Sequence, residues 1–182
     1  MNLPNKLTIL RILMIPVFVV LFYVTAIPIN YILSAIVFTL AAATDFLDGY
    51  IARKYNMVTD FGKFLDPIAD KVLVSTALIV LLGLLHTWYV AICVALIMAR
   101  ELIISGFRLV AAGKGMVIAA DKSGKIKTFF TDVTIVVMLV AVQLNVEWLN
   151  WTGIAMLGVS ALLTIISGVE CLVKNRKVIS SK

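Results

Sequence analysis

Six long apolar segments, separated by short polar stretches, run along the chain. Most of them approach the ~20 residues that a helix needs to cross the hydrocarbon core of a bilayer. The second segment reaches that length only if its helix continues through the charged residues near Asp45. The pattern therefore predicts an all-α integral membrane protein with six transmembrane helices, built as a single domain over residues 1–182. The six segments are Leu7–Val24, Ile29–Ala43, Ile68–Leu85, Trp88–Ala112, Ile126–Leu144 and Leu149–Val173.

Composition agrees with a lipid environment. The chain is 62% hydrophobic and 14% charged, with a mean hydropathy of +1.08, whereas soluble domains are roughly half apolar and about a quarter charged.

The apolar start resembles a signal peptide but lacks a small-residue cleavage site, so we expect a retained first helix. Cys93 and Cys171 have no partner at metal-ligand or framework spacing, which argues against a zinc site or a disulfide. His86 lies beside Trp88 and Tyr89, a grouping typical of a membrane interface.

The distribution of basic residues orients the predicted bundle. All sixteen Lys and Arg residues lie near the N-terminus, in 53–71, in 100–127 or in the C-terminal tail, and none lies in 25–30, 84–89 or 143–151. By the positive-inside rule, both termini and two connections face the cytoplasm, which agrees with six spans in the cytoplasmic membrane. The net charge of +6 then faces anionic lipid headgroups. This arrangement argues against a nucleic-acid partner.

Turn-forming residues suggest two helix boundaries. Asp66 followed by Pro67 predicts a helix start, because Asp is a preferred N-cap residue and Pro is favoured at the first helical position. Gly113 and Gly115 follow the fourth apolar segment and predict the end of its helix.

The chemically informative stretch is 44–71, which contains two pairs of aspartates. Asp45 and Asp48 are three residues apart, and Asp66 and Asp70 are four apart, so each pair shares one helix face. A short connection joins the two predicted helices, and we expect the four carboxylates to converge at the cytoplasmic side. Such a cluster is unfavourable near a membrane unless cations neutralise it, and oxygen ligands favour hard divalent ions. A solvated helix cap would explain one pair, but not the whole set.

Small residues and one arginine accompany these carboxylates. Gly49 and Ala52 lie about one helical turn apart, on or beside the face of the first aspartate pair, and would let a flat group approach the backbone. Arg53 follows with a guanidinium that matches phosphate geometry. Gly62 lies in the connection before the second pair.

The spacing Asp45-x2-Asp48-Gly49-x2-Ala52-Arg53-x8-Gly62-x3-Asp66-x3-Asp70 resembles the signature of the CDP-alcohol phosphotransferase family at every fixed position. The resemblance implies a homodimer of six-helix subunits with a site open to the cytoplasm, where an alcohol attacks the β-phosphorus of a CDP-linked donor and CMP leaves. It implies two divalent cations, Mg²⁺ or Mn²⁺, bound by the four aspartates, with Asp70 also the general base. The residues that would receive the cytidine diphosphate are Asp48, Gly49, Ala52, Arg53, Thr59 and Gly62.

Basic residues in the fourth and fifth segments bear on the acceptor alcohol. Arg100 and Arg108 share a stripe of one predicted helix, and Lys125 and Lys127 lie near the start of the next. Such residues within membrane helices indicate a functional site, and here they suit the phosphate of a phosphorylated acceptor. The alternatives are an ion pair of Arg100 with Asp132 or Glu101, and lysines that extend to the membrane surface.

A second resemblance covers most of the chain. The stretch NLPNKLTILRILMIPVF, the AREL motif with a later Arg at 99–108, and GKIKT at 124–128 are similar to bacterial members of this family. These members use CDP-diacylglycerol and glycerol 3-phosphate, so the resemblance implies phosphatidylglycerophosphate and CMP as products. Asn5, Thr8 and Arg11 recur at three-residue spacing and are expected to border the site. An interfacial helix that begins near Pro4 is the alternative.

Two other interpretations fit part of the pattern. Another family member would use inositol phosphate, serine or phosphatidylglycerol as acceptor, although basic residues favour a phosphorylated one. A divalent-cation transporter would also need acids in the membrane. A permeation path, however, needs polar residues at several depths, whereas these aspartates cluster at the predicted cytoplasmic helix ends.

Overall fold

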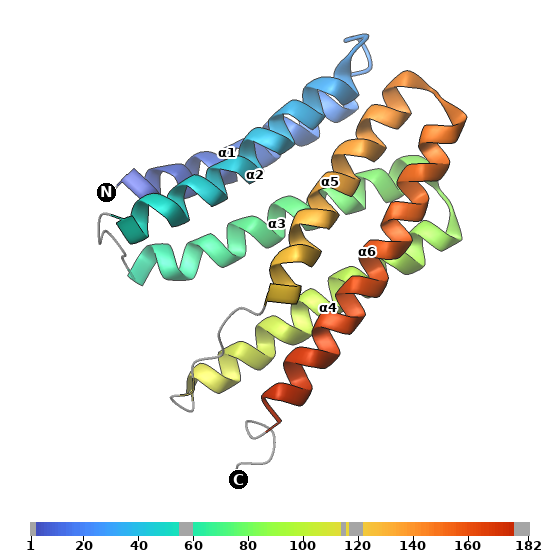
Figure 1. Ribbon diagram of the computed structural model, residues 1–182. Coiled ribbons are helices and arrows are strands. Elements are labelled where there is room, and N and C mark those ends of the chain that lie inside the picture. Colours follow the sequence, from blue (N-terminus) through green and yellow to red (C-terminus); the bar gives the residue numbers. More distant parts are fainter. Residues whose placement is uncertain (1–2, 55–59, 114–115, 117–121, 177–182) are drawn as a thin grey trace.

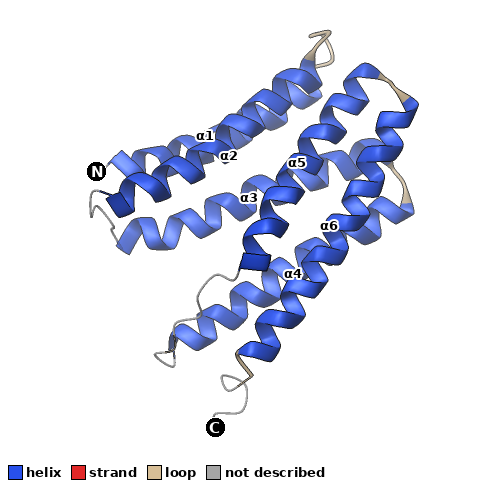
Figure 2. Ribbon diagram, viewed as in Figure 1, coloured by secondary structure: helices blue, strands red, loops and turns tan. Residues whose placement is uncertain are grey.

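The computed structural model describes residues 3–54, 60–113, 116 and 122–176, and all of their side chains except those at 3–4, 46–50, 52–54, 60–61, 63–64 and 122. Within that part of the chain the structure is helical apart from short connections, and it contains no strand (Figure 2). The helices are α1 (Leu3–Tyr23), α2 (Asn30–Lys54), α3 (Asp60–Leu85), α4 (Trp88–Gly113), α5 (Lys122–Leu144) and α6 (Glu147–Lys174).

The helices have the length and composition of membrane spans. They contain between 21 and 28 residues, and a rise of about 1.5 Å per residue makes the shortest about 30 Å long. Five are long and apolar enough to cross a bilayer, and α2 contains a shorter apolar helix, Asn30–Asp45, within its described residues. Each predicted apolar segment matches one helix, apart from Val24 and Ile29, which lie just outside α1 and α2, and α2 continues past Asp45 as expected. The prediction of an all-α integral membrane protein is confirmed.

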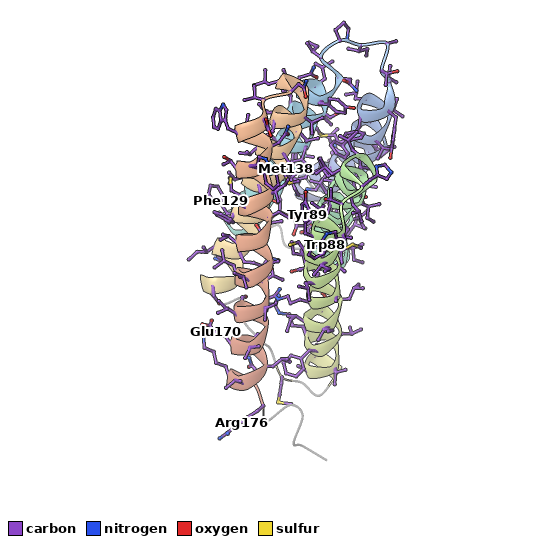
Figure 3. All side chains as sticks on the ribbon, turned by 90° about the vertical axis from the view of Figure 1, so that its right-hand side faces the viewer. Trp88, Tyr89, Phe129, Met138, Glu170 and Arg176 are labelled. Carbon is purple, nitrogen blue, oxygen red and sulfur yellow. The ribbon has the colours of Figure 1, made fainter. Side chains whose placement is uncertain are left out.

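The helices pack around an aromatic and aliphatic core, while apolar side chains also cover the outside. In Figure 1, α1 lies along α2 and also packs on α3, whereas α5 contacts α2, α3 and α6. Phe18, Phe38 and Leu139 are fully buried, whereas Leu13 and Leu109 are exposed. Figure 3 shows α4 and α6 side by side, with many side chains directed outward. Such an outer surface suits contact with lipid.

The alternating direction of the helices gathers the polar site at one end of the bundle. Figure 1 shows that α1, α3 and α5 start, and α2, α4 and α6 end, toward the same side. At the opposite side, His86 after α3 and Asn145 after α5 have positive φ angles of 47° and 52°. This left-handed conformation is one that Asn and His adopt more readily than most residues. His86 therefore closes a helix away from the candidate site.

The start of α3 differs from the prediction. The helix begins at Asp60, and Pro67 lies inside it rather than at its first position. Proline removes one backbone donor, but membrane helices tolerate this loss because neighbouring groups satisfy the freed carbonyl. The carboxylate of Asp66 accepts a hydrogen bond from Thr8 of α1, so it is engaged with a neighbouring helix. The predicted end of α4 at Gly113 is confirmed.

Candidate functional site

A buried arginine of α1 fixes the first aspartate of the motif. The side chain of Arg11 is fully buried, and its Nη1 donates to Oδ1 of Asp45 at 2.8 Å. Its Nε donates to the carbonyl of Ala41 at 3.2 Å and to Oγ1 of Thr44 at 3.3 Å. One guanidinium thus holds the last apolar turn of α2 and orients the carboxylate that follows it.

The same face of α1 contacts the second pair of aspartates. Thr8 lies one turn before Arg11, is fully buried, and donates its hydroxyl to Oδ1 of Asp66 on α3. Asn5 is also buried, one further turn toward the start of the helix. Arg11 and Thr8 therefore place polar groups of α1 against α2 and α3, respectively.

Asp70 brings the two aspartate pairs together. It lies one turn after Asp66, and its carboxylate interacts electrostatically with those of Asp45 and Glu101 and with the cations of Arg11 and Lys127. The carboxylate of Asp132 on α5 interacts electrostatically with those of Asp45 and Asp70. Its buried Oδ1 has no hydrogen-bond partner among the described residues. Carboxylates from α2, α3, α4 and α5 thus share one electrostatic neighbourhood.

Several predicted donor-site residues have positions but no described side chains. Asp48, Gly49, Ala52 and Arg53 lie in the last two turns of α2, and their side chains are outside the described part. Thr59 lies outside the described residues altogether. Gly62 is in the first turn of α3 and is buried.

The donor set fits a hard divalent cation by its chemistry. Asp45, Asp66 and Asp70 supply only carboxylate oxygens, which is the ligand type that Mg²⁺ and Mn²⁺ prefer. Among the side chains that the structure describes, which do not include that of Asp48, no group of three or more His, Cys, Asp or Glu residues is close enough to hold a metal. In this arrangement the carboxylates of Asp45 and Asp66 are engaged by Arg11 and Thr8.

A pocket opens beside Asp70, between α3, α4 and α5. Its wall combines both signs of charge with hydroxyl groups and apolar side chains, so it suits a small polar molecule. Its lining residues are Asp70, Lys71, Val74, Ser75, Leu78, Ile97, Met98, Glu101, Lys127, Thr128 and Thr131.

Glu101 connects the basic residues on this side of the site. Lys127 Nζ forms an ion pair with its Oε1, and Arg100 Nη1 binds the same oxygen at 3.0 Å. Arg100 Nη2 also donates to Oγ of Ser167 on α6 at 2.8 Å. The sequence left two interpretations of Arg100, a contact with the acceptor phosphate and an ion pair. The structure shows the ion pair with Glu101, and Arg100 does not line the pocket.

The remaining predicted basic residues lie outside the pocket. Arg108 and Lys125 are exposed, and neither lines the cavity. Among the lining residues that sequence reasoning missed are Lys71, which donates to Oγ of Ser105 on α4, and Thr131. The available signals were adjacency to Asp70 for Lys71, and the four-residue spacing from Lys127 for Thr131.

The fold and the site define an integral membrane protein with clustered carboxylates beside a small, lysine-lined pocket at one end of its helices. The chain belongs to the CDP-alcohol phosphatidyltransferase family, whose model matches residues 1–166.

Relatives match nearly the whole chain. A protein of Bacillus subtilis (strain 168) is 41% identical over 96% of this chain and 95% of its own length. A protein of Rickettsia bellii (strain RML369-C) is 44% identical over 92% and 91%, and one of Escherichia coli (strain K12) is 38% identical over 94% and 93%. Each is named CDP-diacylglycerol–glycerol-3-phosphate 3-phosphatidyltransferase.

Proposed function

We propose that this protein transfers the phosphatidyl group of CDP-diacylglycerol to glycerol 3-phosphate, giving phosphatidylglycerophosphate and CMP. The observation that carries the proposal is its likeness to enzymes of that name, such as the 41% identity over 96% of the chain. The pocket beside Asp70 supports it independently, because a lysine and hydroxyl groups suit a small phosphorylated alcohol.

The four motif aspartates, Asp45, Asp48, Asp66 and Asp70, would hold two divalent cations, Mg²⁺ or Mn²⁺. When bound, the ions supply positive charge that stabilises the diphosphate and the departing CMP. The chain's own contribution is to orient the carboxylates: Arg11 holds Asp45 from α1, and Thr8 holds Asp66.

The last turns of α2 and the start of α3 would bind the donor. The small residues Gly49, Ala52 and Gly62 let the cytidine diphosphate approach the backbone closely. Arg53 supplies a planar guanidinium for a phosphate oxygen pair, and Asp48 and Thr59 complete the contacts. The diacylglycerol part of the donor would remain in the lipid beside the helices.

On the acceptor side, Lys127 is our choice among the four basic candidates because it lines the pocket that contains Asp70. It would bind the phosphate of glycerol 3-phosphate, and the hydroxyl would then lie toward Asp70. Asp70 takes the hydroxyl proton as the oxygen bonds to the β-phosphorus. The bond from that phosphorus to the bridging oxygen breaks, and CMP leaves with the electron pair. Arg108 and Lys125 are exposed, so they would attract glycerol 3-phosphate toward the site and would not bind it in the pocket.

We also propose the membrane arrangement. All six helices cross the cytoplasmic membrane, and both termini and the site face the cytoplasm, where lysines and arginines are concentrated. The single domain, residues 1–182, works as a homodimer, as the family resemblance implies. The helix ends that carry the aspartates lie on one side of the bundle (Figure 1), which supports one accessible site.

The test is CMP release by the purified protein in detergent with CDP-diacylglycerol, Mg²⁺ and glycerol 3-phosphate. We expect release that depends on glycerol 3-phosphate, is lost in Asp70→Asn, and is unchanged in the control Glu147→Gln, an exposed residue at the other end of the bundle. Release with serine, inositol phosphate or phosphatidylglycerol instead would retain the family and overturn the acceptor. No release with any acceptor, in folded protein, would overturn the activity itself.

A further inference from the structure

The ammonium group of Lys127 lies inside the helix bundle. The residue is 5% exposed, although it projects from α5 into the pocket wall. A lysine side chain is long and flexible, and near a membrane surface it ordinarily extends toward water. A buried charge is tolerated only when it is paired and hydrogen-bonded. Something in the fold must therefore keep this ammonium in place.

Glu101 supplies that counter-charge from α4. Its Oε1 pairs with Lys127 Nζ, and the carboxylate itself lines the same pocket. Asp70 and Asp132 also interact electrostatically with Lys127, but no hydrogen bond between either of them and Lys127 appears among the described contacts. Glu101 is thus the residue that fixes where the ammonium lies.

Glu101 is itself held by a contact that reaches α6. Arg100 Nη1 binds its carboxylate at 3.0 Å, and Arg100 Nη2 donates to Ser167 at 2.8 Å. The side chain of Arg100 passes over Gly168, where an added Cβ would lie 3.0 Å from Arg100 Cγ. The missing side chain at that position leaves the space through which the arginine reaches Ser167. A continuous series of polar contacts therefore runs from α6 through α4 to Lys127 on α5.

We infer that Glu101 is a positioning residue of the acceptor pocket: it holds Lys127 charged and directed at the acceptor phosphate, and Arg100 anchors Glu101 to α6. This inference rests on the proposed function, because it assigns the occupant of the pocket as a phosphorylated alcohol. It gives Arg100 a role through Glu101 rather than a direct phosphate contact. Glu101 lines the pocket proposed for the acceptor, so its effect is expected on the acceptor and not on the donor.

A double-mutant cycle tests the inference. CMP release is compared in wild type, Glu101→Gln, Lys127→Met and the double variant. Glycerol 3-phosphate is varied at saturating CDP-diacylglycerol, and CDP-diacylglycerol is varied at saturating glycerol 3-phosphate. We expect Glu101→Gln to raise the KM for glycerol 3-phosphate about tenfold, the order of one lost contact between charged groups. The KM for CDP-diacylglycerol and kcat change less than about twofold to threefold. In the Lys127→Met background, Glu101→Gln adds almost nothing, because it acts through the missing lysine.

The outcomes separate this inference from the proposed function. If Glu101→Gln raises the KM by the same factor in both backgrounds, or raises the KM for CDP-diacylglycerol equally, Glu101 is only structural and the inference is overturned. If wild type shows no release dependent on glycerol 3-phosphate, the proposed function fails and the inference fails with it.

A second variant covers the case in which Glu101→Gln does not fold. Ser167→Ala leaves Glu101 and Lys127 intact and removes only the hydroxyl that accepts a hydrogen bond from Arg100 Nη2. We expect a smaller rise in the same KM, about twofold to fivefold, because Ser167 acts on Lys127 only indirectly and Arg100 keeps its ion pair with Glu101. An unchanged KM in this folded variant would overturn the anchoring role of Arg100. The control Gly158→Ala lies on the same helix, with no atom within 4 Å of the added Cβ.

Discussion

Replacing Arg11 with methionine removes the charged contact between α1 and α2 while keeping an unbranched side chain that reaches about as far as the Nε position. In the structure this guanidinium is fully buried and makes three contacts to one turn of α2, of which the shortest joins Nη1 to Asp45 at 2.8 Å. Methionine is flexible and fills irregular space well, which limits the loss of packing, although the space of the buried guanidinium tip is not filled. The polar contacts are therefore the main interaction that the variant removes.

The expected cost follows from the exposure of the two partners. Breaking a fully buried ion pair costs about 3–5 kcal/mol, because a charge is left without a partner. Here the buried member, Arg11, is the one removed, and the Asp45 side chain is 47% exposed and can hydrate. The loss is then closer to that of one hydrogen bond between charged groups, about 1.5–3 kcal/mol. On the scale of soluble domains of this size, that lowers the unfolding midpoint by about 3–12 °C.

Two measurements check this result. Thermal unfolding in detergent is followed by reaction of a thiol-specific fluorophore, because Cys171 is buried and Cys93 is partly buried in α6 and α4. CMP release is measured well below both midpoints, and we expect a loss of at least about tenfold, because Asp45 no longer has a fixed orientation. The control Thr44→Val removes the long 3.3 Å contact with Arg11 and the hydrogen bond of the same hydroxyl to the carbonyl of Ala41 within α2, and it should leave the Arg11–Asp45 pair intact. A wild-type midpoint together with wild-type CMP release in Arg11→Met would refute this account of the site.

Three further predictions concern other parts of the structure. Thr8→Val should lower CMP release about tenfold, because it removes a hydrogen bond to a carboxylate, whereas Thr8→Ser keeps the donor to Asp66 and most of the activity. Gly153→Ala should lower the free energy of unfolding by about 1–3 kcal/mol, and with it the unfolding midpoint, since the added Cβ would lie 2.8 Å from Met138 Cγ. The control Gly158→Ala lies in open space and should leave the midpoint unchanged or raise it. Chelation of divalent cations should abolish CMP release, and added Mg²⁺ or Mn²⁺ should restore it; activity that survives chelation would argue against the cation site.

The number and extent of the helices were predictable because lipid imposes strong rules on a sequence. Each span must be apolar over about 20 residues and must satisfy its own backbone. The passage of α2 through Asp45 followed from the same length requirement. Local turn signals were less dependable: Gly113 ends α4, but Pro67 does not begin α3. Proline is compatible with both a first turn and a tolerated interior position, and the sequence alone does not distinguish them.

The site was predictable only where its spacing is local. Asp66 and Asp70 are one turn apart on any helix, so their shared face needs no tertiary information. The interpretations of Arg100 remained open in the sequence, because the choice depends on how α4 packs on α6. Ser167, 67 residues further along the chain, accepts one of its hydrogen bonds. No periodicity within a single helix indicates such a partner, and the same holds for the contact of Lys71 with Ser105.

The two ends of the bundle are stabilised by different chemistry, and this difference suits an enzyme of this kind. Away from the site, neutral amides join the helices: Asn30 Nδ2 donates to the carbonyl of Phe22 at 2.8 Å. Gln143 of α5 donates to the carbonyl of Pro28 and accepts from the backbone of Tyr31. Such contacts do not depend on pH or salt. At the site end the helices are joined by carboxylates and cations, which are the groups that a substrate phosphate or a metal ion would engage. The neutral contacts join α1, α2 and α5 at the end away from the site, so their contribution to packing does not depend on how the charged groups are paired.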